Sequence, residues 1–249
     1  MKRPRAVRNA WYATRYALGS QRWTFPLLRL APGPYASVLV NRGTEVCIDG
    51  FPRSGNTYAA FALLHANPEV RLAHHTHVPM QILRAVNLGV PCVVLARPPL
   101  DTLTSLCIFA DDELSDTIAF KTYIDFHRRI FPVAGAVVVC TFDELVVDPS
   151  VLVRRLNRRY RTSFAGEEPA SDEMKRKLLA RIERDHRAGR KKRLGWTIPN
   201  PEKEELKPGV RRRLSRHPLL EVADSAYRRI VGLTEAPRSP MPRRDPASP

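Results

Sequence analysis

One segment constrains the fold of this chain more than any other: an apolar run that leads into a loop framed by two glycines. The run is Val46-Cys47-Ile48, and the loop is Gly50-Phe51-Pro52-Arg53-Ser54-Gly55-Asn56-Thr57. A helix-forming run, residues 56–66, follows directly. A strand, a tight turn and a helix in this order form an anion cradle, because backbone N–H groups of the turn and of the helix N-terminus point to one place. The segment predicts a phosphate-binding strand–loop–helix unit.

The two glycines have the spacing of a P-loop, G-x-x-x-x-G, but the cation stands elsewhere. A P-loop carries a lysine directly after its second glycine, whereas this chain has Asn56 there and Arg53 inside the loop. Arg53 can bind an anionic oxygen through two parallel hydrogen bonds, and Ser54, Asn56 and Thr57 can add side-chain donors. An ordinary glycine-containing turn has the same frame, so the loop alone does not decide the function.

Apolar runs of strand length alternate with helix-like segments along the rest of the chain. We expect strands at 45–49, 90–96 and 136–142, and a short strand or an extended segment at 70–77. Helices are expected near 8–18 and at 56–66, 79–87, 101–110 (capped by Asp101), 115–131, 149–160 and 172–187. Residues 189–208 are predicted to be a loop, and residues 209–232 one or two last helices. The alternation predicts an α/β fold of three layers, with a central, mostly parallel sheet flanked by helices.

Composition adds limits on organisation and partners. We expect a basic N-terminal arm (1–43), one domain (44–234) and a disordered, proline-rich tail (235–249). The formal charge of +16 over 249 residues favours anionic partners: nucleotides, sulfated or phosphorylated substrates, nucleic acid or anionic lipid. No apolar stretch reaches the roughly 20 residues that cross a bilayer. The four cysteines form no C-x-x-C pair and are predicted to be buried thiols of a reducing compartment, so a cytoplasmic protein is expected.

Three further motifs each follow a predicted strand or helix. Arg97 ends a strand and Ser105 lies eight residues later, so the pair can hold a second phosphate, although a salt-bridged arginine and a surface serine are the simpler alternative. In an extended segment His75 and His77 share one face and His74 points away. An imidazole has a pKa that suits a general base at neutral pH. The scattered cysteines do not complete a set of zinc ligands with these histidines, so no metal is expected. The basic loop Arg190-Lys191-Lys192-Arg193 is a phosphate clamp, a solvated loop or a nucleic-acid patch.

Together these motifs resemble those of the PAPS-dependent sulfotransferases, where PAPS is 3′-phosphoadenosine 5′-phosphosulfate. Residues 51–58 resemble Y-P-K-S-G-T-T-W, residues 97–105 resemble R-x-x-x-D-x-x-x-S, and residues 75–79 resemble K-T-H-L-P. Residues 141–145 are similar to the Y-E-D-L segment and residues 190–196 to R-K-G-x-x-G-x-W, in the same order. The resemblance covers residues 45–200 and implies a P-loop NTPase-like sulfotransferase fold.

The resemblance also implies a role for each matching residue. Residues 53–58 (Arg53, Ser54, Gly55, Asn56, Thr57 and Tyr58) would bind the 5′-phosphosulfate, and Arg97 and Ser105 the 3′-phosphate. Phe142 would lie near the adenosine, and Arg190, Lys191 and Lys192 would close over the nucleotide. His77 would be the catalytic base and Arg53 would stabilise the leaving nucleotide, with transfer of a sulfuryl group to a hydroxyl or amine of a small molecule or glycan. A sulfuryl group carries less charge than a phosphoryl group, so no metal is required.

Four positions depart from the family pattern. The loop lysine is Arg53, which stays charged and cannot hand over a proton. The lysine before the catalytic histidine is His75, the tyrosine near the adenosine is Phe142, and Lys192 stands where a glycine is expected.

Two other functions stay open. A P-loop kinase or nucleotide hydrolase would use Asp143, after the last strand, to hold magnesium. A nucleic-acid-binding protein would explain the charge, although no module for RNA or DNA is legible. Neither the acceptor nor the oligomeric state follows from the sequence.

Overall fold

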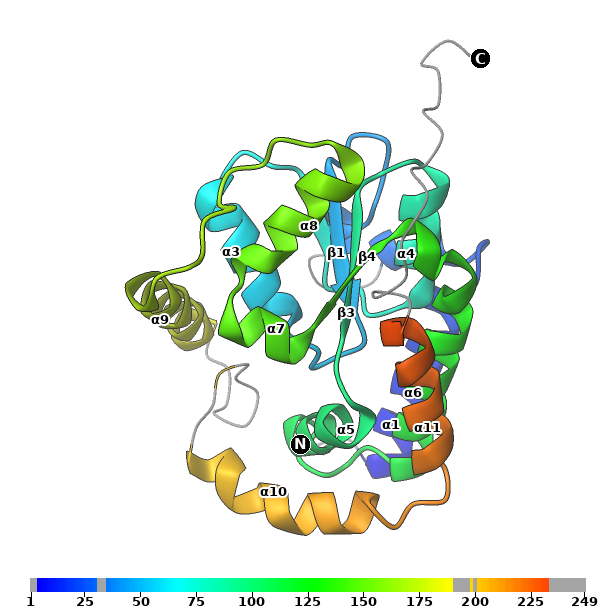
Figure 1. Cartoon of the computed structure of the whole chain (residues 1–249). Helices are drawn as coiled ribbons and strands as arrows, with labels where there is room; N and C mark the ends of the chain where they lie inside the picture. The colour runs from blue at the N-terminus through cyan, green and yellow to red at the C-terminus, as the bar shows by residue number, and fades with distance from the viewer. Residues whose placement is uncertain (1–3, 31–34, 190–197, 199–200, 233–249) are drawn as a thin grey trace.

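A four-stranded, all-parallel sheet forms the centre of the protein in a computed structural model (Figure 1). The structure describes residues 4–30, 35–189, 198 and 201–232. The strands lie in the order β2-β1-β3-β4. Their bounds are β1 (Val46–Gly50), β2 (Leu72–His74), β3 (Cys92–Ala96) and β4 (Val138–Thr141). The α/β class and the parallel sheet that the sequence predicts are confirmed.

Helices connect the strands and continue beyond the last one. The α-helices are α1 (Arg5–Gly19), α2 (Tyr35–Val38), α3 (Asn56–Ala66), α4 (Pro79–Asn87), α5 (Pro99–Phe109), α6 (Asp116–Ile130), α7 (Phe142–Val147), α8 (Ser150–Tyr160), α9 (Asp172–Ala188), α10 (Pro201–Leu214) and α11 (Leu220–Val231), and the short 3-10 helices are η1 (Phe25–Leu30) and η2 (Phe131–Ala136). Two predicted helices, α3 and α4, have the expected bounds. None of the described helices is long and apolar enough to span a membrane.

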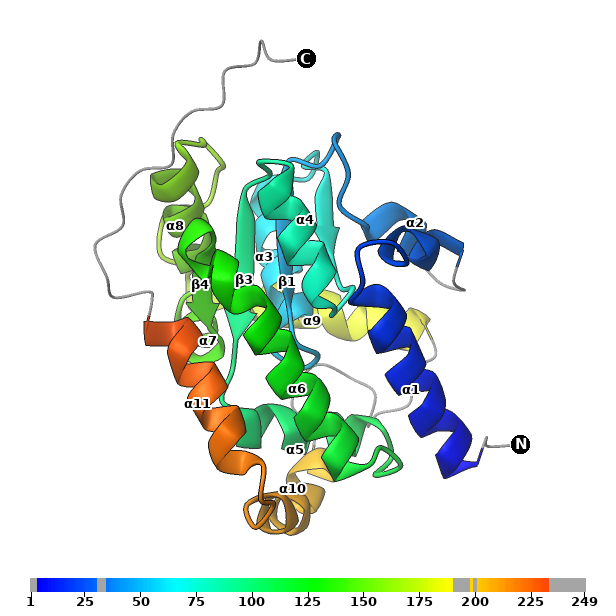
Figure 2. The same cartoon turned by 90° about the vertical axis from the view of Figure 1, so that its right-hand side faces the viewer.

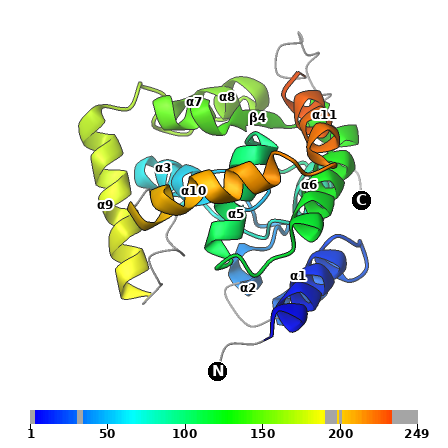
Figure 3. The ribbon, with the colours of Figure 1, turned by 90° about the horizontal axis from the view of Figure 1, so that it is seen from below.

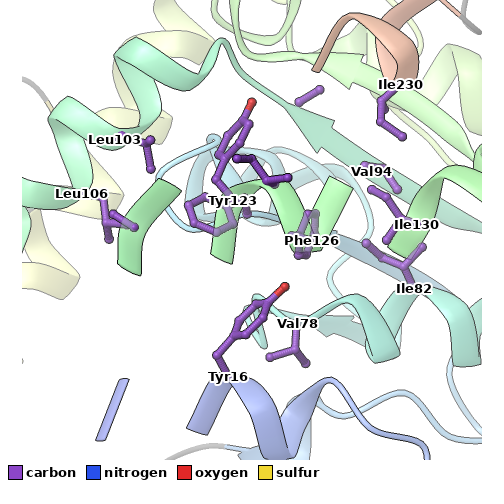
Figure 4. Packing of buried hydrophobic residues seen from close by; sticks show 14 of the residues in the cluster. Tyr16, Val78, Ile82, Val94, Leu103, Leu106, Tyr123, Phe126, Ile130 and Ile230 are labelled. Atoms are coloured by element: carbon purple, nitrogen blue, oxygen red, sulfur yellow. The ribbon is translucent and has the colours of Figure 1, made fainter. Parts of the chain in front are cut away.

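Both faces of the sheet are covered, because successive strand residues point to opposite sides. Val46 and Ile48 contribute to an apolar cluster with α3, α7 and α8, whereas Cys47 contributes to a larger cluster with α1, α4, α5, α6 and α11. Figures 1 and 2 show the two groups of helices on either side of the strands, and Figure 4 shows part of the larger cluster, including Tyr123 and Phe126 of α6. All four cysteines are free and buried, as predicted.

The N-terminal segment differs from the peripheral arm that its basic composition predicts. Tyr16, Phe25, Leu28, Leu39 and Val40 are all buried in the larger cluster. The segment therefore contributes to the core, and α1 packs against α6.

Two local predictions are wrong for identifiable reasons. Asp101 does not cap α5, which begins two residues earlier at Pro99; the Asp101 carboxylate instead pairs with Arg211. Residues 201–208 are not a loop, because α10 begins at Pro201 and continues through Pro208. This helix packs against α5 (Figure 3), with Val210 and Leu214 buried, so tertiary packing outweighs the missing backbone donor of the proline.

Candidate functional site

The candidate site lies at the carboxyl end of the sheet, where the loop after β1 meets the N-terminal part of α5. Ligands of open α/β sheets bind at this end of the strands. Phe51 anchors the loop in the core: its side chain is fully buried and packs edge to face against Tyr123, with ring centroids 5.0 Å apart. Gly55, which precedes α3, has a φ of 95°, a left-handed conformation that favours glycine. The loop is therefore anchored on an aromatic core and fixed in shape.

Arg53 points from this loop toward α5. Its Nε donates a hydrogen bond to the Oγ of Ser105 over 3.0 Å, and its guanidinium lies 5.0 Å from the centre of the Phe109 ring. Burial, together with the charge of Arg97, lowers the pKa of Arg53 to about 10. Arg53 itself has a φ of 73°, which a non-glycine residue adopts only at a cost. The structure thus brings together two predicted site residues, Arg53 and Ser105, from different elements.

Arg97, at the end of β3, reaches back to the same loop. Its Nη1 donates to the backbone oxygen of Arg53 over 3.0 Å. The hydroxyls of Tyr123 and Thr102 donate to the Arg97 carbonyl over 2.7 and 3.1 Å, which fixes the backbone of this residue. Its pKa is lowered by burial, against the opposing effect of Asp101 and Asp143.

Phe142 completes this side of the site. The guanidinium carbon of Arg97 lies 3.9 Å from the centre of the Phe142 ring, a cation–π geometry. The ring also approaches Gly55, where an added Cβ would lie 3.2 Å from Phe142 Cδ2. The predicted residues of three different loops therefore touch one another.

The remaining residues of the loop start α3. The backbone N–H groups of Asn56, Thr57 and Tyr58 occupy its first turn, where a helix offers them no acceptor. Among the described residues, the buried Oγ of Ser54 and Oδ1 of Asn56 have no hydrogen-bond partner. Tyr58 packs against the apolar cluster beneath α3, so its ring faces the core.

The histidine segment turns sharply where an extended conformation was expected. Strand β2 ends at His74, and His75 and His77 both have a φ of 58°. His75 Nε2 lies 3.0 Å from Thr57 Oγ1, and the His75 and His77 ring centroids are 5.6 Å apart. The prediction that His74 points away is wrong, because its ring contacts that of His75, with centroids 4.6 Å apart. Burial lowers the pKa of His74.

His77 is fixed on the glycine loop itself. Its Nδ1 lies 2.9 Å from the backbone oxygen of Gly50. A carbonyl oxygen only accepts, so Nδ1 carries the proton and Nε2 keeps its lone pair in the neutral ring. This is the tautomer that a base acting through Nε2 requires.

Asp49, at the end of β1, is a site residue that the sequence analysis missed. Its carboxylate is fully buried and accepts hydrogen bonds from Thr76 N at 2.9 Å, Thr76 Oγ1 at 2.7 Å, His77 N at 3.2 Å and Gly50 N at 2.8 Å. Burial acts to raise the Asp49 pKa, but His77 and these donors outweigh it and lower the pKa. The only signal in the sequence is a charged residue at the end of an apolar run.

Lys203 of α10 is a second residue that the sequence analysis missed, because its segment was predicted to be a loop. Its side chain is buried, and its Nζ donates to the backbone oxygen of Ile198 over 3.3 Å. Burial and the charge of Arg53 lower its pKa to about 8. Lys203 is thus a third cation near the loop, after Arg53 and Arg97. The predicted closing residues Arg190, Lys191 and Lys192 lie outside the described residues.

The resemblance of these motifs to those of a known family is not accompanied by similarity over the whole sequence. No protein-family model and no characterised protein matches the sequence of this chain.

Proposed function

We propose that this protein is a sulfotransferase that moves a sulfuryl group from PAPS to an acceptor hydroxyl or amine, on a P-loop NTPase-like sulfotransferase fold. One observation carries the proposal: the predicted base His77, the loop cation Arg53, and the pair predicted to bind the second phosphate, Arg97 and Ser105, all meet at the loop after β1. His77 contacts Gly50, Arg53 contacts Ser105, and Arg97 contacts Arg53, each within 3.0 Å. These residues are dispersed over more than fifty positions and come from four segments of the chain.

The charges of the site fit a nucleotide with more than one anionic group. Arg53, Arg97 and Lys203 lie close enough that Arg53 depresses the pKa of Lys203, and Arg97 that of Arg53. Such like charges repel one another in a buried site, and a bound anion relieves that repulsion. A 3′-phosphate and a 5′-phosphosulfate would supply anions at two positions, one toward Arg97 and one toward the turn before α3.

Each residue then has a distinct part in the reaction. PAPS, when bound, supplies an activated sulfuryl group whose bond to the 5′-phosphate oxygen breaks as the bond to the acceptor oxygen forms. His77 Nε2 takes the proton of the acceptor hydroxyl. Arg53 and the N–H groups at the start of α3 stabilise the negative charge that grows on the leaving oxygen. Arg53 does so by charge and hydrogen bonding alone, since an arginine does not donate its proton.

Asp49 acts in this account as a positioning residue. Its carboxylate holds the backbone of Thr76 and His77, and its Oδ1 lies 3.5 Å from His77 Nδ1. A buried anion at that distance stabilises the imidazolium that forms when His77 accepts a proton, in the way that a carboxylate supports the histidine of other acid–base catalysts.

A P-loop kinase or hydrolase remains the second candidate. Asp143, which would hold magnesium, lies in the exposed first turn of α7 and near Arg97. No group of three or more acidic, histidine or cysteine side chains in the described ranges is arranged to hold a metal ion. Thermal stabilisation by adenosine 3′,5′-bisphosphate, compared with that by ATP and magnesium, separates the two candidates.

The experiment that tests the proposed activity is turnover of PAPS against a panel of phenols, sugars, lipids and amines. We expect at least one acceptor to yield a sulfated product and adenosine 3′,5′-bisphosphate. The His77→Ala variant is expected to lose about two or more orders of magnitude in turnover while keeping its affinity for adenosine 3′,5′-bisphosphate. Unchanged turnover in this variant would remove His77 as the base, and transfer from ATP with no reaction of PAPS would favour the kinase.

A further inference from the structure

The N-terminal segment exposes an unusual amount of apolar surface. Half of the large hydrophobic side chains that are exposed in the described part of the chain lie within residues 7–30: Val7, Trp11, Leu18, Trp23, Leu27 and Leu30. Trp23 and Leu30 are 84% and 82% exposed. Single exposed apolar residues are ordinary, but a concentration of them in one segment marks an interaction surface.

The exposed residues of α1 form one face of this helix. Val7, Trp11 and Leu18 are spaced by four and seven residues, which places them in one stripe. Tyr12 and Tyr16 lie on the opposite face and pack against or within the core. η1 follows directly and packs against α1, and it adds exposed side chains at Leu27 and Leu30. Figure 2 shows α1 along the outer edge of the molecule.

The charge of this segment has a single sign. Residues 1–44 contain no aspartate or glutamate, and their cationic residues are Lys2, Arg3, Arg5, Arg8, Arg15, Arg22, Arg29 and Arg42. Arg22 and Arg29 are exposed beside Trp23 and Leu30, and the Arg22 guanidinium lies 5.4 Å from the centre of the Trp23 ring. Carboxylates from other elements lie against this segment: that of Glu113 pairs with Arg8, and that of Asp125 accepts a hydrogen bond from Tyr16 and pairs with Arg129. Tryptophan and leucine flanked by arginine are the composition of helices that lie in the interface of a membrane.

We propose that residues 5–30 form a membrane-binding surface that attaches this protein to anionic lipid. Trp11, Trp23, Leu27 and Leu30 would enter the boundary between headgroups and acyl chains, and the exposed Arg22 and Arg29 would contact lipid phosphates. A second copy of this chain fits less well, because a symmetric dimer over this surface would place cations against cations. A nucleic acid would match the arginines but would leave the aliphatic side chains of Val7, Leu18, Leu27 and Leu30 in water.

The same surface is connected to the candidate site. Arg15 of α1 donates through Nη2 to the backbone oxygen of Thr76 over 2.9 Å, and Tyr16 belongs to the same buried cluster as Val78 (Figure 4). The membrane-facing helix therefore supports the backbone on either side of His77. Membrane attachment itself does not depend on sulfuryl transfer, so the two proposals can fail separately.

Flotation with lipid vesicles tests the proposal on the full chain. We expect the protein to float with vesicles that contain phosphatidylglycerol but not with vesicles of phosphatidylcholine alone, and added salt should weaken the binding. Leu27→Ser with Leu30→Ser should reduce partitioning about tenfold or more, and Arg22→Gln with Arg29→Gln should reduce it by a similar factor. Tryptophan fluorescence of the unsubstituted protein should shift to shorter wavelength on binding, because Trp11 and Trp23 would leave water. Both variant pairs keep these two tryptophans, so the same signal can be compared among the three proteins.

Matched substitutions elsewhere serve as controls. Val146→Ser with Val147→Ser changes exposed apolar residues of α7, and Arg158→Gln with Arg176→Gln removes exposed cations of α8 and α9. These variants should bind vesicles as the unsubstituted protein does, and circular dichroism shows whether each variant is folded. The proposal is overturned if anionic vesicles are not bound, if the control pairs reduce binding as much as the N-terminal pairs, or if Leu27→Ser with Leu30→Ser only dissociates a dimer in light scattering.

Discussion

The Nε of Arg53 donates a hydrogen bond to the Oγ of Ser105 over 3.0 Å and joins the loop after β1 to the helix after β3. This contact holds a partly buried guanidinium whose pKa is lowered by desolvation and by the charge of Arg97. Ser105→Ala removes the acceptor, and the Arg53 side chain should become less ordered. We expect the affinity for adenosine 3′,5′-bisphosphate, measured by calorimetry, to fall about fivefold to tenfold. Ser225→Ala, on the exposed part of α11, is the control; an equal loss in both variants would contradict a specific role for Ser105.

Lys203 tests whether α10 belongs to the site. Lys203→Met keeps the length of the buried side chain but removes its charge, so it should weaken nucleotide binding about tenfold without lowering the melting temperature. Because the pKa of Lys203 is lowered to about 8, binding to the unsubstituted protein should also weaken above that pH as the ammonium loses its proton. Lys207→Met, one turn along α10 and partly exposed, should leave affinity unchanged. Unaltered affinity in Lys203→Met would place this lysine outside the site.

Asp49→Asn separates positioning from binding. The amide can keep part of the hydrogen bonding to Thr76 and His77 but removes the negative charge beside the imidazole. We expect kcat to fall about tenfold to a hundredfold, the affinity for the nucleotide to remain, and the pH profile of kcat to change. A purely structural role would instead lower the melting temperature and leave the pH profile as it is.

The same aspartate predicts a pH dependence of stability. Its pKa is lowered in the folded state, so its contribution is present above the pKa of an unfolded aspartate and is lost as the pH falls through the lower, folded value. Denaturant unfolding at acidic pH should therefore show a smaller further loss in Asp49→Asn than in the unsubstituted protein. A loss of equal size in both would contradict this contribution.

His127 predicts a second, separate loss of stability, at higher pH. It is buried beneath Phe51, with ring centroids 6.5 Å apart, and its Nδ1 lies 2.8 Å from the Tyr123 oxygen. Burial lowers its pKa to about 4, so the unfolded chain binds a proton at this histidine more readily than the folded protein does. The free energy of unfolding is therefore unaffected by this group above pH 6.5 and decreases as the pH falls from 6.5 toward about 4. This lowering of the His127 pKa from 6.5 to about 4 corresponds to on the order of 3 kcal/mol in the free energy of unfolding. In His127→Gln the free energy of unfolding should depend less steeply on pH over this range. An unchanged slope would contradict a contribution from His127.

Local patterns account for the parts of the structure that the sequence predicts. The helix stop at Asn67-Pro68 and the proline at the start of α4 delimit α3 and α4, and fully buried runs delimit β1 and β3. The carboxyl ends of parallel strands lie at one end of the sheet, so the loops after β1 and β3 are expected there. The contact between Arg53 and Arg97 also requires β1 and β3 to be neighbours, which the sequence does not predict.

Long-range contacts decide the parts that the sequence does not predict. α10 contains Pro208, which favours a loop in the sequence, but the segment packs against α5 as a helix. Because this segment is predicted to be a loop, the sequence does not indicate that Lys203 lies near the site. Asp49 resembles an ordinary strand end until the turn at His75 and His77, with a φ of 58° at both, brings Thr76 onto its carboxylate.

The most direct measurement of the central claim is the affinity of the full chain for adenosine 3′,5′-bisphosphate and for adenosine 5′-monophosphate, determined by titration calorimetry. The account predicts that the bisphosphate binds at least about tenfold more tightly, and that Arg97→Ala removes most of this difference while leaving the monophosphate affinity nearly unchanged. Equal affinity for the two nucleotides in the unsubstituted protein, or tighter binding of ATP with magnesium than of the bisphosphate, would contradict a site built for a 3′-phosphate.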